Sequence, residues 1–417
     1  MTSSHFHYRA GALFCEETPI SEIAHRVGTP IYVYSQAELL GRAIEAQQAA
    51  AALSSASLIC FALKANGNPA LLRMLAAAGL GADVTSQGEL FLARHASIPP
   101  EKIVFSGVGK TPAEIRTALE SGIKALHVES ADELDAIGEI AAARGRSAPI
   151  SIRVNPDITV STHPHIGTGA RAHKFGIQIS EVLALLDRAE RHPCLQPVGL
   201  AVHIGSQITD LASFQSAAHA LVALAREAAA RGVALAYLDV GGGLAVAYAK
   251  EMAPTLADWI SAAGAPIAQA GFDLVLEPGR SLVAAAGCLV TTVLYAKEQG
   301  GKRFVITDAG MTDLLRPALY GAYHAVWPVR QRTGRLRPVD VVGPVCESSD
   351  VLASQRELPE LSRNDLLAVM DVGAYGYAMS SNYNGRLRPA EVLVSGTSWR
   401  PIRQRQQLEE LLAGCSP

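Results

Sequence analysis

The sequence lacks long apolar runs, a surplus of positive charge and clustered cysteines, and each absence argues against a class of protein. No apolar stretch approaches the roughly 20 residues of a membrane-spanning helix, and the polar residues 1–8 do not resemble a signal peptide. A net charge of −3 without a basic run argues against nucleic acid as the main partner. We therefore expect a cytoplasmic protein that engages neither membranes nor nucleic acid.

The six cysteines are scattered, with no close pair of the kind that binds zinc. They are Cys15, Cys60, Cys194, Cys288, Cys346 and Cys415. We expect a reducing compartment, no metal site, and thiols that are mostly buried as small apolar groups. Only Cys346 has neighbours that suggest chemistry.

Short apolar segments alternate with helical stretches over the larger part of the chain. Eight segments read as buried strands, namely Leu58–Leu63, Gly81–Val84, Ile103–Phe105, Ala125–Val128, Ile150–Val154, Val198–Ile204, Tyr237–Val240 and Leu274–Glu277. Helices are predicted at Gln36–Leu53, Ala70–Ala78, Gln87–His95, Pro112–Glu120, Ala131–Ala143, Glu181–Arg191, Leu211–Arg231 and Leu256–Gln269. This pattern predicts a closed (β/α)8 barrel, although an open doubly wound sheet alternates in the same way.

Polar and glycine residues stand at the carboxyl ends of nearly all the predicted strands. They are Lys64, Asp83, Ser106, Gly107, His127, Glu129, Arg153, Asn155, His203, Gly205, Ser206, Asp239, Gly241, Gly242, Gly243, Glu277, Gly279 and Arg280. An active site at the C-terminal face of a barrel requires this arrangement. We therefore favour the barrel, in which these side chains converge.

From residue 281 the chain becomes β-rich, with segments punctuated by proline and glycine. Strands are predicted at Cys288–Tyr295, Arg303–Asp308, Val339–Val342, Leu366–Asp371 and Glu391–Val394. The early segment Ile31–Tyr34 has no place among the eight barrel strands, so we expect it to pair with this region. The predicted domains are a barrel at 35–280 and a β-rich domain formed by 1–34 and 281–417.

The segment Asn155–Lys174 is long for a connection and contains three histidines and several glycines. We expect it to be a lid or a substrate-binding loop. Its histidines lack the spacing of helical metal ligands, so a metal site is not expected there.

Lys64 stands at the exit of the first predicted barrel strand. Apolar groups around such an amine favour its neutral, nucleophilic form, which can form a Schiff base. Taken alone, a solvated lysine that marks the end of a strand is the commoner case.

The run Gly241–Gly243 follows the seventh strand, and three glycines let backbone N–H groups approach an anion. A phosphate cradle and a tight strand-to-helix turn explain the glycines equally well. In barrels, however, phosphate sites are frequently built after the seventh and eighth strands. The position therefore favours the cradle.

The sixth and eighth strands end on groups suited to an aromatic cofactor. Glu277 would be costly to bury without a cation, and a protonated ring nitrogen meets that need, although a nearby arginine or lysine would as well. His203 precedes Gly205 and Ser206, which offer an N–H group and a hydroxyl to an anion; a histidine satisfied within the core is the alternative. Together with Lys64, these residues describe a site for pyridoxal phosphate.

The sequence resembles the diaminopimelate decarboxylases, a family with an alanine-racemase-like barrel and a C-terminal β domain. The matching stretches are Phe61–Asn66, Ala82–Leu90, His203–Gln207, Asp239–Gly243, Glu277–Arg280, Asp308–Tyr320, Gly343–Asp350 and Asp371–Gly376. They are spread over most of the chain. The stretches around Cys346 and at Arg316–Tyr320 are more specific than the lysine or glycine motifs.

The resemblance implies a role for each matching residue. Lys64 would form the Schiff base with pyridoxal 5'-phosphate, His203 would stack on its ring, and Glu277 would pair with the ring nitrogen. The further cofactor-binding residues would be Asp83, Ser206, Gly241, Gly242, Gly243, Gly279, Arg280 and Tyr375. The substrate-binding residues would be Arg280, Arg316, Tyr320 and Tyr375, with Glu347 taking the distal ammonium. The segment with Cys346 would reach the active site of a partner subunit, which implies a homodimer.

The implied reaction is the decarboxylation of meso-2,6-diaminopimelate to L-lysine, the last step of lysine biosynthesis. Lys64 or Cys346 would return a proton to the α-carbon, and capture of a second carboxylate by arginine would set the substrate preference. One alternative is a related decarboxylase of another basic amino acid or of carboxynorspermidine. Another is a non-catalytic pyridoxal phosphate carrier, against which the β domain counts.

The sequence departs from the family at two positions. Ala201 stands where relatives often carry a second histidine, and His173 stands where a small or polar residue is common. Neither is a predicted catalytic residue, so the departures concern the shape of the pocket and the lid.

Overall fold

The computed structural model describes residues 5–53, 56–158, 174–249 and 251–416. The chain divides into two compact units. The barrel unit comprises Arg42–Val246 and Met252–Ser281, and the β unit comprises Met1–Gly41, Ala247–Glu251 and Leu282–Pro417. Most of the predicted lid, including His173, falls on residues that lie outside the described ranges.

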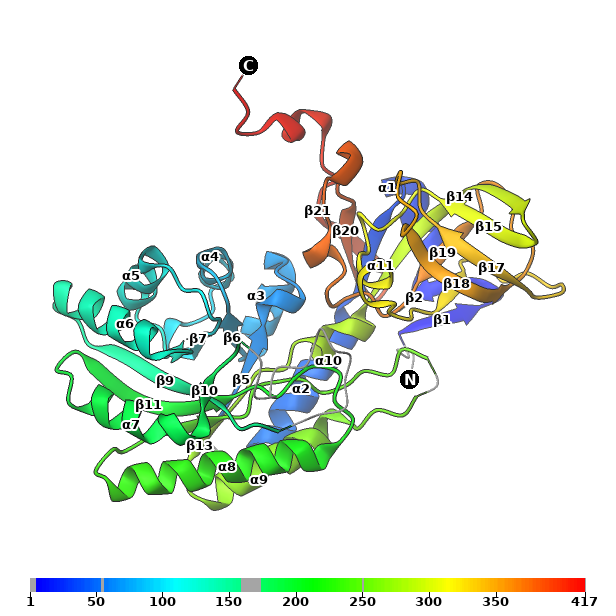
Figure 1. Ribbon diagram of the computed structural model, residues 1–417. Helices are drawn as coiled ribbons and strands as arrows, with labels where there is room; N and C mark the ends of the chain where they lie inside the picture. Colours follow the sequence, from blue (N-terminus) through cyan, green and yellow to red (C-terminus); the bar gives the residue numbers. More distant parts are fainter. Residues whose placement is uncertain (1–4, 54–55, 159–173, 250, 417) are drawn as a thin grey trace. The chain divides into compact units, whose positions relative to one another are not determined.

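The barrel unit is built on eight parallel strands (Figure 1). They are β5 (Ser57–Ala62), β6 (Gly81–Val84), β7 (Ile103–Phe105), β8 (Ala125–Val128), β9 (Ala148–Asn155), β11 (Leu195–Val202), β12 (Tyr237–Asp239) and β13 (Asp273–Leu276). Each of the eight pairs with two others of the eight, and the ring closes where β13 pairs with β5 and β9 with β8. A short ninth strand, β10 (Ile177–Gln178), pairs with β9 outside the ring. Closure excludes the open doubly wound sheet and confirms the predicted (β/α)8 barrel.

Helices alternate with these strands along the chain. They are α2 (Gln36–Leu53), α3 (Pro69–Ala77), α4 (Gln87–His95), α5 (Pro112–Ser121), α6 (Ala131–Ala143), α7 (Ile179–Glu190), α8 (Leu211–Ala230) and α9 (Leu256–Gln269). Capping residues set several of their starts: the Thr111 hydroxyl accepts from the Glu114 N–H in a capping box, and the Ser130 hydroxyl accepts from the Glu133 N–H. The predicted helices are therefore confirmed.

Apolar side chains fill the space within the barrel. Cys60, Val104, Ala125, Tyr237 and Val275, from five different strands, form one buried cluster. Helices α8 and α9 pack together, with the rings of Phe214 and Trp259 edge to face at 6.0 Å. This packing explains why the strands read as short apolar runs that turn polar only at their ends.

The β unit contains a mixed sheet in the order β18-β17-β15-β14-β4-β20-β21, with β19 paired to β14 and β16 paired to β19. Its strands are β4 (Ile31–Ser35), β14 (Gly287–Gln299), β15 (Lys302–Thr307), β16 (Val326–Pro328), β17 (Arg337–Val342), β18 (Val351–Leu358), β19 (Leu366–Val369), β20 (Ala390–Ser395) and β21 (Ser398–Arg403). The early strand β4 pairs with both β14 and β20, as predicted. A separate sheet of β1 (Phe6–Arg9), β2 (Ala12–Cys15) and β3 (Thr18–Pro19) leads into α1 (Ile20–Val27).

The cysteines only partly follow the prediction that most are buried. Cys15, Cys60 and Cys288 are buried, Cys194 is half-buried, and Cys346 and Cys415 are exposed. The exceptions lie in a turn, a bend and the C-terminal segment, outside the helices and strands. Among the described residues, no helix has the length and apolar character needed to span a bilayer.

Candidate active site

Lys64 lies in a 3-10 turn (η1, Leu63–Ala65) directly after β5, so the strand delivers its side chain to the barrel mouth. Its Nζ is 3.0 Å from Oδ2 of Asp83 on β6. Asp83 is fully buried, whereas the Lys64 side chain is 37% exposed. A buried carboxylate therefore holds this amine, a contact that the sequence analysis did not predict.

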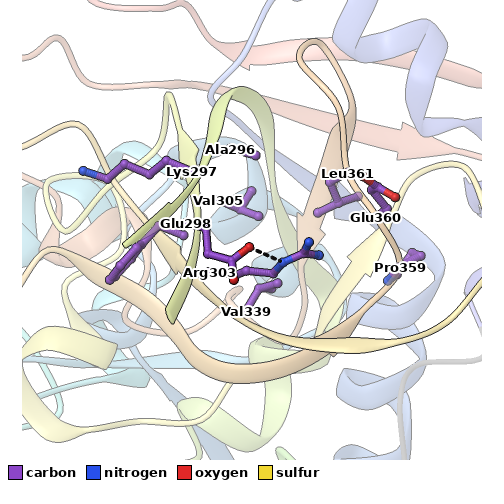
Figure 2. A pocket seen from close by; sticks show the side chains of 10 residues that line it. Ala296, Lys297, Glu298, Arg303, Val305, Val339, Pro359, Glu360 and Leu361 are labelled. Atoms are coloured by element: carbon purple, nitrogen blue, oxygen red, sulfur yellow. Dashed lines mark ion pairs between the residues drawn. The ribbon is translucent and has the colours of Figure 1, made fainter. Parts of the chain in front are cut away.

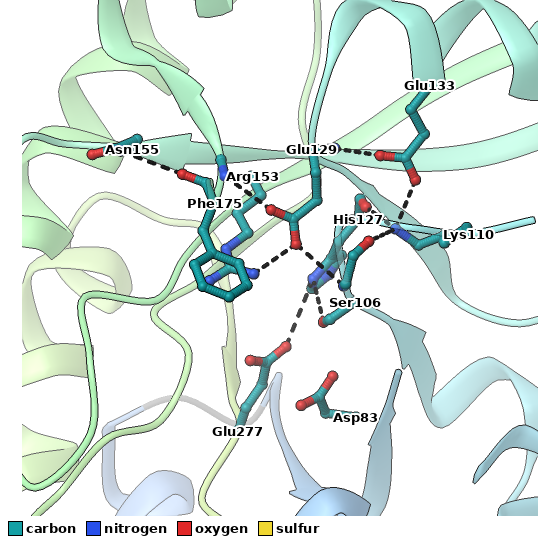
Figure 3. Close-up of polar contacts among 12 residues, drawn as sticks. Asp83, Ser106, Lys110, His127, Glu129, Glu133, Arg153, Asn155, Phe175 and Glu277 are labelled. Atoms are coloured by element: carbon teal, nitrogen blue, oxygen red, sulfur yellow. Dashed lines mark hydrogen bonds and ion pairs between the residues drawn. The ribbon is translucent and has the colours of Figure 1, made fainter. Parts of the chain in front are cut away.

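Asp83 also belongs to a buried cluster of ionisable groups, here called the acid cluster: Asp83, His127, Asp239 and Glu277. Asp83, His127 and Glu277 are drawn in Figure 3. The two ring nitrogens of His127 lie 3.8 Å from Oδ2 of Asp239 and 3.7 Å from Oε1 of Glu277. Oδ1 of Asp239 accepts from the Gly241 N–H at 2.8 Å. The ends of β6, β8, β12 and β13 thus bring three carboxyl groups and one imidazole together.

Burial is the main cause of the pKa shifts of Glu277, Asp239 and His127 in the acid cluster. It raises the pKa of Glu277 well above its usual value, and the carboxyl groups of Asp239 and Asp83 add to this. Burial also raises the pKa of Asp239, to about 7, and lowers the pKa of His127 to about 3. At neutral pH we therefore expect a neutral imidazole and a proton shared between Asp239 and Glu277.

Asp83 has the opposite tendency. Burial alone would raise its pKa, but the Lys64 ammonium and a hydrogen bond from Ser106 outweigh burial and hold the pKa below its usual value. The cluster thus separates one ionised carboxylate, paired with Lys64, from two carboxyl groups that hold a proton.

Four buried atoms of the acid cluster have no hydrogen-bond partner among the described residues: Asp83 Oδ1, His127 Nε2, Asp239 Oδ2 and Glu277 Oε1. Among those residues Glu277 lies 3.7 Å from the neutral imidazole of His127 and forms no ion pair with an arginine or lysine, which was the alternative considered from the sequence. Buried acceptors of this kind suit a protonated ligand nitrogen. The ligand atoms of His127, Asp239 and Glu277 also lie within 4.8 Å of one another, a spacing open to a metal ion.

A second buried ion pair anchors the start of the segment that follows the predicted lid. Arg153 Nη1 lies 2.6 Å from Oε1 of Glu129, and the Glu129 carboxylate also accepts from the N–H groups of Gly107 and Gly176 (Figure 3). The Arg153 guanidinium lies over the Phe175 ring, 4.9 Å from its centroid. These contacts fix the chain on the C-terminal side of residues 159–173.

Gly241, Gly242 and Gly243 all occupy positions where a Cβ atom does not fit. It would lie 2.4 Å from the Val202 carbonyl oxygen at Gly241, 2.2 Å from that of Glu277 at Gly242, and 2.2 Å from that of Gly205 at Gly243. Close packing of this turn therefore requires glycine, as expected for a tight strand-to-helix turn. The role of these glycines as a phosphate cradle stays a prediction.

His203 follows β11 and contacts the glycine turn. Its Nδ1 accepts from the Gly242 N–H at 3.2 Å, so the proton of the neutral ring is on Nε2. Desolvation lowers the pKa of His203 to about 3, and the nearby Lys64 ammonium acts in the same direction. The ring is half-buried and neutral, which suits stacking on an aromatic ligand.

The remaining predicted cofactor residues of the barrel unit also meet. Arg280, at the start of α10 (Arg280–Val283), donates from Nη2 to the Ser206 hydroxyl at 3.0 Å. Gly279 packs closely against Ala62 and Ala65, on either side of Lys64 in sequence. Residues after β11, β12 and β13 therefore form one polar surface beside the end of β5.

The other predicted site residues belong to the β unit. Arg316 begins α11 (Arg316–Tyr320) and is buried, and Tyr320 ends this helix and is half-buried. Cys346 and Glu347 are exposed; the Cys346 N–H donates to Asn384, and the Glu347 carboxylate accepts from the Tyr383 hydroxyl at 3.5 Å.

Tyr375 stands out because its backbone is left-handed, with φ of 57°. This conformation is unfavourable for a bulky residue and persists only where the surroundings impose it. Nearby Gly373 packs so tightly that a Cβ atom would lie 1.9 Å from the Val283 carbonyl oxygen. Tyr375 is therefore held in place, and its side chain is half-buried.

A cavity of about 190 Å³ lies elsewhere in the β unit, between β14, β15, β17 and the residues after β18 (Figure 2). Its lining includes Lys297, Glu298, Arg303 and Glu360, with Glu298 and Arg303 paired at 3.6 Å. The predicted site residues are not among the residues that line it. It is therefore no part of the candidate active site.

Comparisons with known proteins place the chain in a family. Residues 40–284 match the family described as "Pyridoxal-dependent decarboxylase, pyridoxal binding domain". The chain is 47% identical to a diaminopimelate decarboxylase of Pseudomonas aeruginosa, over 98% of both chains. It belongs to the diaminopimelate decarboxylase family. The resemblance noted in the sequence is thereby confirmed.

Solved structures of the diaminopimelate decarboxylase family agree in fold. The enzyme of Helicobacter pylori complexed with L-lysine is 42% identical, with a TM-score of 0.89 over 94% of this chain and 98% of that chain. The enzyme of M. jannaschii in co-complex with L-lysine is 36% identical, with a TM-score of 0.94 over 100% and 99%. The similarity therefore extends through the β unit, beyond the region matched by the pyridoxal-binding family.

The barrel mouth fits the pyridoxal cofactor of this family. Lys64 supplies an amine, Glu277 supplies a buried acceptor with an unpaired oxygen, and the glycine turn is stripped of side chains. The sequence analysis assigned no role to two residues of the acid cluster, His127 and Asp239. Their positions at the ends of strands could be predicted from the sequence. Their closeness to Glu277 could not, because it depends on how the barrel closes.

Proposed function

We propose that this protein decarboxylates meso-2,6-diaminopimelate to L-lysine and carbon dioxide with pyridoxal 5'-phosphate, as the last step of lysine biosynthesis. The observation that carries the proposal is similarity to diaminopimelate decarboxylases over 98% of both chains, which includes the β unit with the predicted substrate residues. The pyridoxal-binding match alone would support only the cofactor.

The barrel unit would hold the cofactor through residues at the ends of five strands, β5, β6, β11, β12 and β13. Lys64 offers the amine for covalent attachment, and Asp83 orients it. Glu277 offers a carboxylate to the ring nitrogen, His203 offers a neutral ring face, and the glycine turn with Arg280 and Ser206 binds the phosphate. When bound, the cofactor supplies an electron sink for the α-carbon from which carbon dioxide leaves.

The protein's own groups handle protons and substrate charge. The acid cluster keeps a negative charge close to the ring nitrogen, because Asp239 and Glu277 share one proton between two carboxyl groups. Lys64 or Cys346 returns a proton to the α-carbon. Arg316, Arg280 and Tyr320 would bind the distal carboxylate, Glu347 the distal ammonium, and Tyr375 both cofactor and substrate.

We also propose a cytoplasmic homodimer in which Cys346 and Glu347 serve the active site of the partner subunit. The support is the resemblance at Gly343–Asp350 and the exposure of both side chains in the single chain. An exposed thiol and an exposed carboxylate with catalytic roles are easier to understand if a second copy covers them.

The proposal is tested with purified protein supplied with pyridoxal phosphate. It should release one carbon dioxide per molecule of meso-diaminopimelate and form L-lysine in equal amount, with L-ornithine and L-arginine as control substrates. Activity on ornithine or arginine alone would contradict the substrate assignment. Lys64→Ala should abolish the absorption band of the covalently bound cofactor, whereas Lys297→Ala, which changes an exposed lysine on β14, should leave that band intact.

A further inference from the structure

The guanidinium of Arg316 is fixed within the β unit by two aromatic partners. Its Nη1 lies 2.7 Å from Nε2 of His324. Its Cζ lies 4.8 Å from the ring centroid of Tyr248, in the geometry of a cation–π contact. Arg316 is 5% exposed and His324 is fully buried. The arginine is therefore held in one orientation at a position where water contributes little.

The hydrogen bonds of His324 define its proton. Its Nδ1 lies 2.8 Å from the carbonyl oxygen of Met370, which can only accept, so Nδ1 carries the hydrogen. Arginine can only donate, so Nε2 must be bare and accept from the guanidinium. The imidazole is thus the neutral Nδ1–H form. Its hydrogen bond to the Met370 carbonyl fixes the ring, and the fixed ring in turn orients the guanidinium of Arg316.

The sheet fixes the position of His324. It precedes β16, and Met370 follows β19, and these two strands are antiparallel neighbours with Val326 opposite Val369. The Met370 N–H also donates to the Ala325 carbonyl at 2.8 Å. The imidazole is therefore anchored to paired backbone segments, while Arg316 stands on a short helix of five residues.

Tyr248 completes the arrangement. Its ring meets the His324 ring edge to face, with centroids 5.0 Å apart and an interplanar angle of 72°. The guanidinium thus contacts an aromatic face and an imidazole edge that are themselves packed together. Neither of these two partners carries a negative charge, so they orient the arginine without neutralising it.

We propose that His324 is a positioning residue that holds Arg316 for a carboxylate of the substrate and so sets the preference for a substrate with two carboxylates. The inference rests on the proposed function, which assigns Arg316 to the distal carboxylate. A neutral acceptor is suited to this task, because a carboxylate in its place would compete with the substrate for the cation. Bidentate recognition also demands a fixed guanidinium plane, which His324 provides.

Two substitutions of His324 separate its two hydrogen bonds. His324→Gln keeps an acceptor near the Nε2 position, and His324→Asn keeps a donor near the Nδ1 position without an acceptor for Arg316. We expect His324→Asn to raise KM for meso-diaminopimelate about tenfold with kcat within about twofold, since the loss affects binding of an unreacting group. His324→Gln should stay within about threefold of the wild-type KM.

A double-mutant cycle with Arg316→Lys tests whether His324 acts through the arginine. Lysine lacks the planar fork, so in the Arg316→Lys background the His324→Asn change should raise KM by less than about twofold. Equal fold-changes in both backgrounds would mean that His324 has a general structural role, and would overturn the inference. An unchanged KM in His324→Asn would overturn it as well.

A spectroscopic measurement keeps the inference testable if His324→Asn does not fold. In wild-type protein labelled with 15N-histidine, the His324 signals, assigned by their loss in His324→Gln, should show hydrogen on Nδ1 and none on Nε2. Hydrogen on Nε2 would overturn the inference. Wild-type protein that does not act on meso-diaminopimelate would refute the proposed function. If the wild type is active but the KM for meso-diaminopimelate is the same in His324→Asn, only the role of His324 is refuted.

Discussion

The amine of Lys64 and the carboxylate of Asp83 form an ion pair of 3.0 Å in which the two partners differ in exposure. Asp83 is fully buried on β6, whereas Lys64 reaches the mouth of the barrel and is 37% exposed. A buried carboxylate that loses its cation keeps the cost of desolvation without the attraction. The charge of Asp83 therefore depends on the residue that the proposed chemistry uses.

Removing the Lys64 ammonium should destabilise the protein through Asp83. The pKa of Asp83 is lowered in the folded state, so its contribution to stability is present above its unfolded pKa and is lost as pH falls. We expect Lys64→Met to lower the unfolding free energy of cofactor-free protein by about 1–3 kcal/mol at pH 8, discounted because Lys64 is partly exposed. Thermal unfolding at a series of pH values should show that the difference in stability between wild type and Lys64→Met becomes smaller toward pH 4.

Addition of Asp83→Asn to Lys64→Met should restore part of that loss, because no buried charge remains. Thermal unfolding of wild type, both single variants and the double variant forms the cycle. A double variant that is no more stable than Lys64→Met at pH 8 would show that the ion pair is not the cause.

Glu277→Gln should stabilise the cofactor-free protein while removing activity. The pKa values of Glu277 and Asp239 are raised in the folded state, so the folded protein binds extra protons and loses stability as pH rises through this window. We expect Glu277→Gln to be more stable than wild type at pH 8 by on the order of 1–3 kcal/mol, with the gap closing toward pH 5. Decarboxylation should fall on the order of 100-fold.

The matched control for this change is Glu120→Gln, an exposed carboxylate paired with Arg144 on the surface. It should change stability by less than about 0.5 kcal/mol at either pH and leave decarboxylation unchanged. A lower melting temperature for Glu277→Gln than for wild type at pH 8 would contradict the inference that Asp239 and Glu277 share a proton.

Gly242→Ala should disrupt the glycine turn. A Cβ atom there would lie 2.2 Å from the Glu277 carbonyl oxygen, which is backbone and cannot move without moving β13. We expect a loss of about 2–4 kcal/mol and much weaker retention of pyridoxal phosphate, measured by denaturant unfolding and cofactor titration. Gly41→Ala is the control: it lies within α2 with open space at Cβ, so alanine should be neutral or stabilise by up to about 1 kcal/mol.

The barrel could be predicted from the sequence because its signals are local. Each strand is a short apolar run that ends on a polar or glycine residue, and Thr111 and Ser130 mark helix starts by their own hydrogen bonds. The resemblance to the family then assigned roles to those strand ends. The alternation of strands and helices fits an open sheet equally well, so the prediction of a closed ring depended on the polar residues at the strand ends, and the pairing of β13 with β5 confirms it.

The β unit was harder to predict for physical reasons. Strand β18 has several exposed positions and β21 lies at the edge of its sheet, so neither has a clear apolar alternation. The contact of His324 with Arg316 depends on the pairing of β16 with β19, and the shared proton of the acid cluster depends on distances between strands. Such features arise from tertiary structure and leave no signal in the sequence around each residue.

Co-expression of two inactive variants tests the proposed homodimer with shared sites. If one site uses Lys64 of one subunit and Cys346 of the other, a dimer of Lys64→Ala with Cys346→Ala has one intact site. Random pairing should then restore about one quarter of the wild-type activity. Lys64→Ala combined with Glu277→Gln is the control, because both residues belong to the barrel unit and no intact site can form. Carbon dioxide release from the mixed dimers measures both, and restoration in neither pair would place Cys346 in the site of its own subunit.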